Sequence, residues 1–121
     1  MAKRDIKPQS EEITDLTPEE AFLMIKENKN NSNLVIIDIR TPAEYNECHI
    51  EGAKNIDYQS FDFEEILEEM DKNKKYILYC RSGARSIISC DVLKNLGFSD
   101  IYNIKGGMDV WKKMGFPIFS L

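Results

Sequence analysis

The chain has 121 residues, of which 42% are hydrophobic and 31% charged, and its formal net charge is -5. This length supports one hydrophobic core and therefore a single domain rather than two. The acidic balance argues against nucleic acid or an anionic membrane as a general partner, and no apolar stretch approaches the length of a membrane span.

The first quarter of the chain predicts a tail, an edge strand and a capped helix. Residues 1–12 are polar and lack the apolar core of a signal peptide, so we expect a flexible tail there and one domain over 13–121. Residues 13–16 are expected to form a short edge strand. The Thr-Pro-Glu-Glu run at 17–20 then predicts a helix start, because it combines a capping box with proline in the first turn.

The central part of the chain predicts alternating strands and helices. The run Leu34–Asp38 is continuously apolar up to its final aspartate, which is typical of a strand covered on both faces. The Thr-Pro-Ala-Glu run at 41–44 repeats the capping box and predicts a short helix. A brief strand at 53–56, a helix around 66–70 and a strand at 76–79 follow.

The C-terminal part predicts a helix over 84–96, a strand over 101–104, a turn at Gly106-Gly107 and a final helix around Trp111. The first of these helices is expected to bury its large apolar side chains, Ile88, Val92, Leu93 and Leu96. The whole pattern indicates an α/β fold with a mostly parallel central sheet and helices on both faces. Ligands of such folds bind beyond the carboxyl ends of the strands.

One cysteine lies at such a carboxyl end. Cys80 leaves the strand at 76–79, enters a short turn and is followed by a helix. The candidate loop and substrate-binding residues are Arg81, Ser82, Gly83, Ala84 and Arg85, with Ser86 as a supporting hydrogen-bond donor. Backbone N–H groups, a helix N-terminus and two arginines all favour a thiolate, the reactive form of cysteine, so we interpret Cys80 as a nucleophile that handles an anion.

A second polar pair follows the strand at 34–38. Asp38 and Arg40 are expected to lie at the same edge of the sheet as Cys80, where they would pair and support the active loop. An ordinary ion pair that shapes a loop is an equally compatible interpretation.

Four motifs resemble, in order, those of the rhodanese-like single-domain sulfurtransferase family. The segment 80–85 is similar to the six-residue active-site loop of that family. The other three are Asp38-Ile39-Arg40 with Glu44-Tyr45, His49–Ile56, and Gly106-Gly107 with Trp111, Gly115 and Pro117. The resemblance implies a rhodanese-like domain in which Cys80 takes a sulfane sulfur as a persulfide. The implied donor is a small sulfur-containing anion such as thiosulfate, or a persulfide. The implied acceptor is a thiol, cyanide or a sulfur-acceptor protein, and no cofactor is implied.

Two other functions stay open at this point. Phosphatases and arsenate reductases of the same fold use a similar cysteine and arginine. The resemblance implies one more residue between the two in the phosphatases, whereas only four separate Cys80 from Arg85, which favours sulfur over phosphate. A non-catalytic interaction module is the third interpretation.

The remaining cysteines and the single histidine are assigned mainly structural roles. Three cysteines without close pairing indicate a reducing, cytoplasmic location rather than a disulfide framework. Cys48 stands where the family usually has glycine. It is either a tolerated substitution or a thiol that resolves the Cys80 persulfide. Cys90 is expected to be a packing residue and His49 a structural hydrogen-bonding residue, and no metal site is predicted.

Overall fold

Five parallel strands form the central sheet of this protein, in the order β2-β6-β5-β3-β4. The computed structural model describes residues 13–120, so the expected tail at 1–12 lies outside the described residues. The strands are β2 (Ile13–Leu16), β3 (Leu34–Asp38), β4 (Lys54–Asn55), β5 (Lys75–Tyr79) and β6 (Ile101–Ile104). The helices are α1 (Pro18–Glu27), α2 (Pro42–Glu47), α3 (Phe63–Glu68), α4 (Ala84–Asn95) and α5 (Gly107–Lys113). In this part of the chain, no helix has the length and apolar character needed to cross a membrane.

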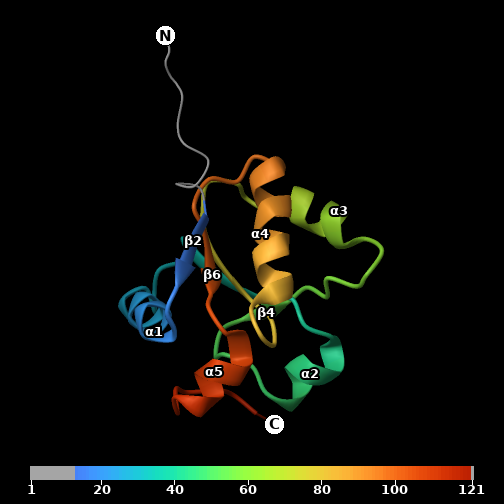
Figure 1. The fold of residues 1–121 in the computed structure, drawn as a ribbon. Coiled ribbons are helices and arrows are strands. Elements are labelled where there is room, and N and C mark those ends of the chain that lie inside the picture. The colour runs from blue at the N-terminus through green and yellow to red at the C-terminus, as the bar shows by residue number, and fades with distance from the viewer. Residues whose placement is uncertain (1–12, 121) are drawn as a thin grey trace.

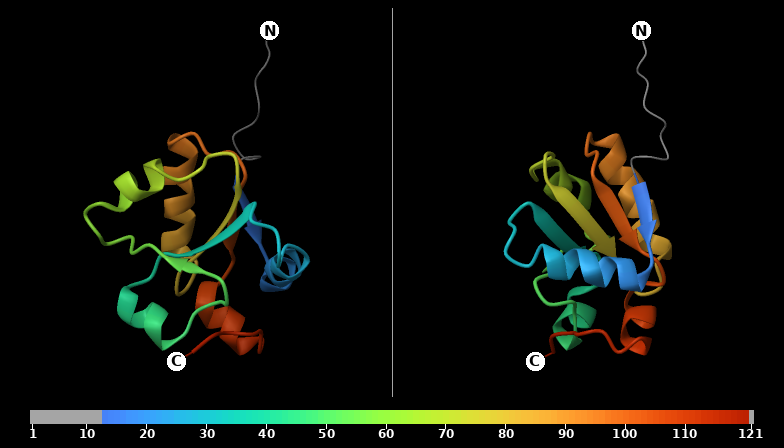
Figure 2. Two further views of the ribbon diagram at one scale, coloured as in Figure 1. Left: turned by 180° about the vertical axis from the view of Figure 1, so that it is seen from behind. Right: turned by 90° about the vertical axis from the view of Figure 1, so that its left-hand side faces the viewer.

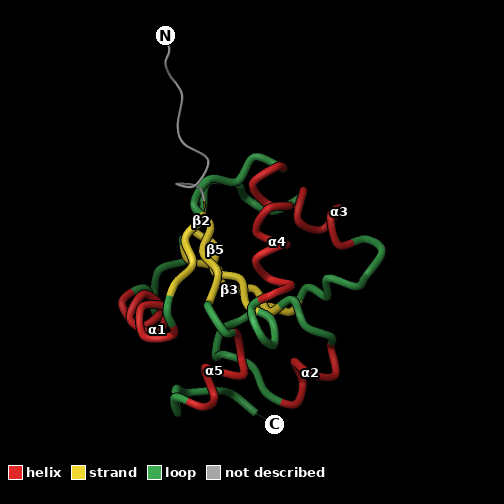
Figure 3. The backbone as a smooth tube through the Cα atoms, viewed as in Figure 1, coloured by secondary structure: helices red, strands yellow, loops and turns green. Residues whose placement is uncertain are grey.

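The sheet separates two layers of helices (Figure 1). Helices α3 and α4 cover one face, while α1 lies on the other, as the reverse and side views also show (Figure 2). Helices α2 and α5 lie near the ends where the strands give way to loops (Figure 3). The predicted α/β class, with a parallel sheet and helices on both faces, is therefore confirmed.

The alternation of side chains along the strands divides the core in two. Successive residues of a strand point to opposite faces of the sheet. In β5, Ile77 and Tyr79 join the core beneath α1 and α5, whereas Leu78 and the following Cys80 join the core beneath α3 and α4. This alternation fixes which face of the sheet receives the candidate nucleophile.

Both predicted capping boxes are present. The Thr17 hydroxyl accepts a hydrogen bond from the Glu20 N–H at 3.1 Å, and the Glu20 carboxylate accepts one from the Thr17 N–H at 2.9 Å. Thr41 and Glu44 exchange the same pair of bonds at the start of α2. Each box supplies acceptors for N–H groups that have no partner within the helix, which explains why these local signals were reliable.

One expectation about α4 is wrong. Ile88 is 55% exposed, and Val92 and Leu96 are only partly buried. The helix instead buries a side made mostly of small residues: Ser86, Ser89, Cys90 and the predicted Leu93. Small side chains let α4 approach β5 and β6 closely, and this arrangement turns Ile88 towards solvent.

Candidate active site

Cys80 lies at the carboxyl edge of the sheet, between the end of β5 and the start of α4. Its side chain is only 4% exposed and faces α4 because it follows Tyr79 in the strand alternation. Parallel α/β sheets place their ligands at this edge. The predicted position of the thiol is therefore the observed one.

Three hydrogen-bond donors converge on the Cys80 sulfur. The Gly83 N–H donates to Sγ at 3.0 Å, and the Ser86 N–H and hydroxyl each donate at 3.3 Å. Ser86 is fully buried, so its donors are held within the packed start of α4. Donors directed at one atom favour negative charge on it, and the positive end of the α4 dipole acts in the same direction. Three hydrogen-bond donors directed at one sulfur atom are the arrangement that a nucleophilic cysteine would need.

Gly83 shapes the turn that directs these donors. Its φ is +97°, a left-handed conformation that glycine adopts without a steric penalty, and it caps the N-terminus of α4. A Cβ at this position would also approach the Gly106 nitrogen to 3.0 Å. A side chain here would push the active loop away from the start of α5.

The start of α5 holds the active loop through its backbone. The Met108 N–H donates to the Cys80 carbonyl at 2.8 Å, and the Asp109 N–H donates to the Arg81 carbonyl at 2.9 Å. Gly107 makes this contact possible, because a Cβ there would collide with the Cys80 carbonyl oxygen and come within 2.7 Å of the Arg81 carbonyl oxygen. The C-terminal helix is therefore part of the structure that fixes the loop.

Both loop arginines are exposed at the mouth of the site. The Arg81 Nε lies 3.8 Å from an Asp109 carboxylate oxygen, with both side chains more than half exposed. The Arg85 guanidinium lies over the Tyr58 ring, with 5.2 Å between its Cζ and the ring centroid. Ser82 and Ala84 are exposed as well. Both guanidinium groups therefore lie at the surface, Arg81 beside Asp109 and Arg85 over Tyr58.

Asp38 and Arg40 form the expected pair, but not as a direct support of the loop. The Arg40 Nη2 donates to an Asp38 carboxylate oxygen at 2.7 Å and to the Cys48 carbonyl at 2.6 Å. The Tyr79 hydroxyl donates to the same Asp38 oxygen at 2.8 Å. Burial acts to lower the pKa of Arg40, but its hydrogen bond to Asp38 and the attraction of that charge outweigh burial and raise it. The pair thus holds Tyr79, the last residue of β5, through its hydroxyl group. Tyr79 directly precedes Cys80 and points to the opposite face of the sheet.

Burial also determines the state of the Tyr79 phenol. Burial, followed by the negative charge of Asp38, raises the pKa of Tyr79 far above its ordinary value. The phenol therefore stays protonated and donates to Asp38, while its oxygen accepts a hydrogen bond from the Ile50 N–H at 3.0 Å.

The other two cysteines do not enter the loop. Cys48 is extended, with φ at -166°, so the left-handed turn expected of the family glycine is not formed and cysteine fits without strain. Its side chain belongs to the core beneath α1 and α5, whereas Cys80 belongs to the core on the other face, which argues against a direct disulfide between them.

The third cysteine, Cys90, is buried in α4. Burial, followed by the charge of Asp91, raises the pKa of Cys90 to about 12. Cys90 is therefore a neutral packing residue, as expected.

His49 has the structural environment expected of it. Its ring stacks on Tyr45 at 3.8 Å between centroids, and Nδ1 lies 2.8 Å from the Tyr45 carbonyl oxygen. Within residues 13–120, no three His, Cys, Asp or Glu side chains group closely enough to hold a metal ion.

Two neighbours of the loop arginines were missed by sequence reasoning. Tyr58 and Asp109 come from the segment after β4 and from α5, so no spacing along the chain connects them to residues 81–85. Gly106-Gly107 indicated a turn before the predicted final helix and formed part of the C-terminal motif, but neither feature indicated that this helix places Asp109 beside Arg81.

The chain is similar to known proteins in sequence along most of its length. A family model described as the rhodanese-like domain matches residues 6–114. A sulfurtransferase of Allochromatium vinosum is 33% identical over 91 residues, which cover 75% of this chain and 83% of that protein. The thiosulfate sulfurtransferase GlpE of Actinobacillus pleuropneumoniae is 30% identical over 109 residues, covering 90% of this chain and 95% of that protein.

Solved structures agree on the fold. A rhodanese-related protein from Thermoplasma volcanium superposes with a TM-score of 0.73 at 24% identity, covering 88% of this chain and 97% of that one. At this level of identity the match supports the architecture alone.

Proposed function

The chain belongs to the rhodanese-like domain family, and from that premise we propose that it is a sulfurtransferase in which Cys80 carries the transferred sulfur. The observation that supports this proposal most directly is that the Gly83 N–H and both Ser86 donors converge on the Cys80 sulfur. These donors favour the thiolate that must attack a donor molecule.

The proposed reaction has two displacement steps. With thiosulfate as donor, the Cys80 thiolate attacks the outer, sulfane sulfur, a new S–S bond forms, and sulfite leaves with the electron pair of the broken S–S bond. In the second step an acceptor such as cyanide attacks the outer sulfur of the persulfide. Thiocyanate forms and the Cys80 thiolate is regenerated, so each cycle returns the enzyme to its starting state.

The exposed arginines support an anionic substrate. Arg81 and Arg85 flank the loop as cations on a chain whose net charge is -5, so they attract anions locally against an acidic background. Guanidinium groups suit oxyanions such as the sulfonate end of thiosulfate. We further propose a reducing cytoplasmic setting, because Cys48, Cys80 and Cys90 are all free thiols.

The test is the intact mass of the protein after incubation with thiosulfate or with a small-molecule persulfide. Wild type and a Cys90→Ser control are expected to gain one sulfur atom and release it to cyanide as thiocyanate. The Cys80→Ser variant is expected to gain none. Sulfur loading that persists in Cys80→Ser would refute the assignment of the carrier.

A second assay addresses the competing chemistry. Hydrolysis of an aryl phosphate by wild type but not by Cys80→Ser, with no sulfur loading from either donor, would replace sulfur transfer by phosphoryl transfer. Absence of both activities in a folded protein would favour the interaction module.

A further inference from the structure

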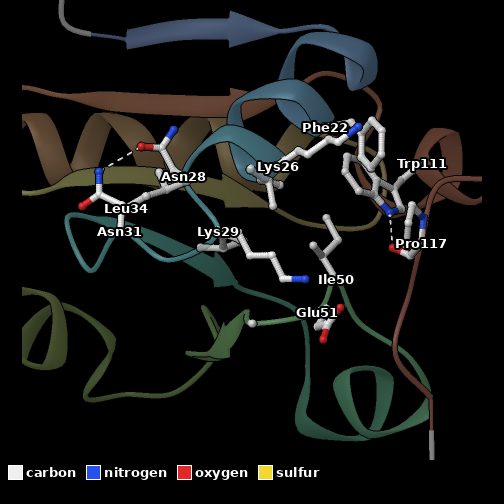
Figure 4. A pocket seen from close by; sticks show the side chains of 13 residues that line it. Phe22, Lys26, Asn28, Lys29, Asn31, Leu34, Ile50, Glu51, Trp111 and Pro117 are labelled. Carbon is white, nitrogen blue, oxygen red and sulfur yellow. Dashed lines mark hydrogen bonds between the residues drawn. The ribbon is translucent and has the colours of Figure 1, made fainter.

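A cavity of about 450 Å³ lies on the face of the sheet opposite to Cys80 (Figure 4). Helix α1 forms one wall, and the segment around Ile50 and the end of the chain near Pro117 form others. Its volume falls within the range of roughly 300–1,000 Å³ that small-molecule sites occupy. The sulfurtransferase reaction proposed above does not use it.

The floor of the cavity is apolar. It is formed by aromatic and aliphatic side chains from four separate segments: Phe22, Ile25, Leu34, Ile50, Trp111 and Pro117. The amides at its rim are already engaged, since the Asn28 side chain donates to the Met24 carbonyl and the Asn31 side chain donates to Asn28. The one polar group of the Trp111 ring is also satisfied, because Nε1 donates to the Pro117 carbonyl at 2.9 Å. A bound molecule would therefore contact the floor of the cavity mainly through apolar surface.

Two lysines supply the unsatisfied charge at the opening. Lys26 and Lys29 line the cavity from α1 and the turn after it, and both are exposed. Within residues 13–120, neither ammonium group has a hydrogen-bonding or ionic partner. Lys29 extends across the opening towards Ile50 and Glu51, as the close-up shows (Figure 4). Glu51 is the one acidic residue of the lining, so the charged groups at the opening sum to a net positive charge on a chain of net charge -5.

We propose that this cavity binds a small amphipathic anion, with an apolar acyl or aryl body on the floor and a carboxylate at Lys26 and Lys29. The proposal does not depend on sulfur transfer, because the cavity and Cys80 belong to different faces of the sheet. The net positive charge of the rim favours an anion over a neutral ligand, and the Asn28 and Asn31 side chains already hydrogen-bond within the rim.

The only tryptophan of the chain makes the proposal directly measurable. Trp111 is 1% exposed and lines the cavity, so a bromine atom on a bound ligand would quench its fluorescence on contact. The probe is ω-bromooctanoate, with ω-bromooctanol as its uncharged counterpart and octanoate as a competitor without bromine. Saturable quenching by ω-bromooctanoate that octanoate reverses is the expected result.

Matched variants test the role of the lysines. Lys26→Gln/Lys29→Gln is expected to weaken ω-bromooctanoate binding about tenfold, the scale of two exposed ion pairs. Lys105→Gln/Lys113→Gln removes the same charge from exposed positions that do not line the cavity, and it is expected to bind like wild type.

Three results would overturn the proposal. One is the absence of saturable quenching up to the solubility limit of the probe. Another is equal affinity in the Lys26→Gln/Lys29→Gln variant. The third is binding of ω-bromooctanol as tightly as ω-bromooctanoate, which would make the cavity a site for uncharged apolar molecules.

Discussion

Replacement of Gly107 by alanine is expected to separate α5 from the active loop. Gly107 has φ at +58°, so any other residue there adopts a left-handed conformation at a cost of about 1–2 kcal/mol. The new Cβ would also collide with the Cys80 carbonyl oxygen and press on the Arg81 carbonyl oxygen. Relief of this collision breaks the two hydrogen bonds that α5 donates to these carbonyls, each contributing about 1 kcal/mol. The Gly107→Ala variant should therefore lose about 3–4 kcal/mol of unfolding free energy.

Gly115→Ala is the matched control for this change. Gly115 also has a positive φ, +79°, but a Cβ there would meet nothing within 4 Å. This control pays only the conformational cost, about 1–2 kcal/mol. Urea denaturation followed by Trp111 fluorescence gives both free energies, and the rate of alkylation of Cys80 reports on the geometry of the loop. Equal destabilisation of the two variants, with an unchanged alkylation rate in Gly107→Ala, would refute the idea that α5 fixes the loop.

Three further predictions concern single side chains. Ser86→Ala removes one donor from the Cys80 sulfur, so alkylation of Cys80 by iodoacetamide should slow about fivefold, the equivalent of one hydrogen bond; an unchanged rate would contradict this role. The pKa of Cys90 is raised from 9.0 to about 12 by burial, so the unfolded chain releases this proton at lower pH than the folded protein does. The unfolding free energy of wild type should therefore fall as pH rises through the window from 9.0 to about 12, by up to about 1.4 kcal/mol per unit, and urea titrations of Cys90→Ala should show a shallower fall. Asp38→Asn leaves Arg40 with a buried, uncompensated charge and should cost about 3 kcal/mol in urea denaturation; a loss below about 1 kcal/mol would show that the pair contributes little.

Local signals predicted most of the fold. The two capping boxes act through neighbours within a few residues, and the apolar run at 34–38 is continuous, so the sequence alone contains these signals. The expected position of Cys80 also followed from a local rule, since the carboxyl end of a parallel strand leads into the loop that binds ligands.

The errors and omissions are matters of tertiary packing. Ile88 was expected in the core because it is large and apolar, but the closer fit of small residues against the sheet determines how α4 is rotated about its axis. Asp38 and Arg40 were expected to pair, either as a support of the active loop or as an ordinary ion pair, and the pair forms. Its connection to the loop through the Tyr79 hydroxyl, on the face opposite to Cys80, is a tertiary contact that no spacing indicates. Tyr58 and Asp109 reach the arginines from distant segments, which no spacing in the sequence reveals.

The alternation of Tyr79 and Cys80 has a consequence for how this chain can change in length. Because neighbouring residues of β5 face opposite cores, deletion of one residue within the strand would exchange the faces of every position before the deletion or after it. Either the thiol would leave its donors on α4, or Ile77 and Leu78 would swap environments. Such a deletion changes the register of the strand, and no single substitution elsewhere restores the original facing of its side chains. Insertions should be tolerated best around the exposed Gln59 and Phe61, in the surface turn before α3 (Figure 1) and beyond the Tyr58 contact with Arg85, and should be excluded from the five residues of β5.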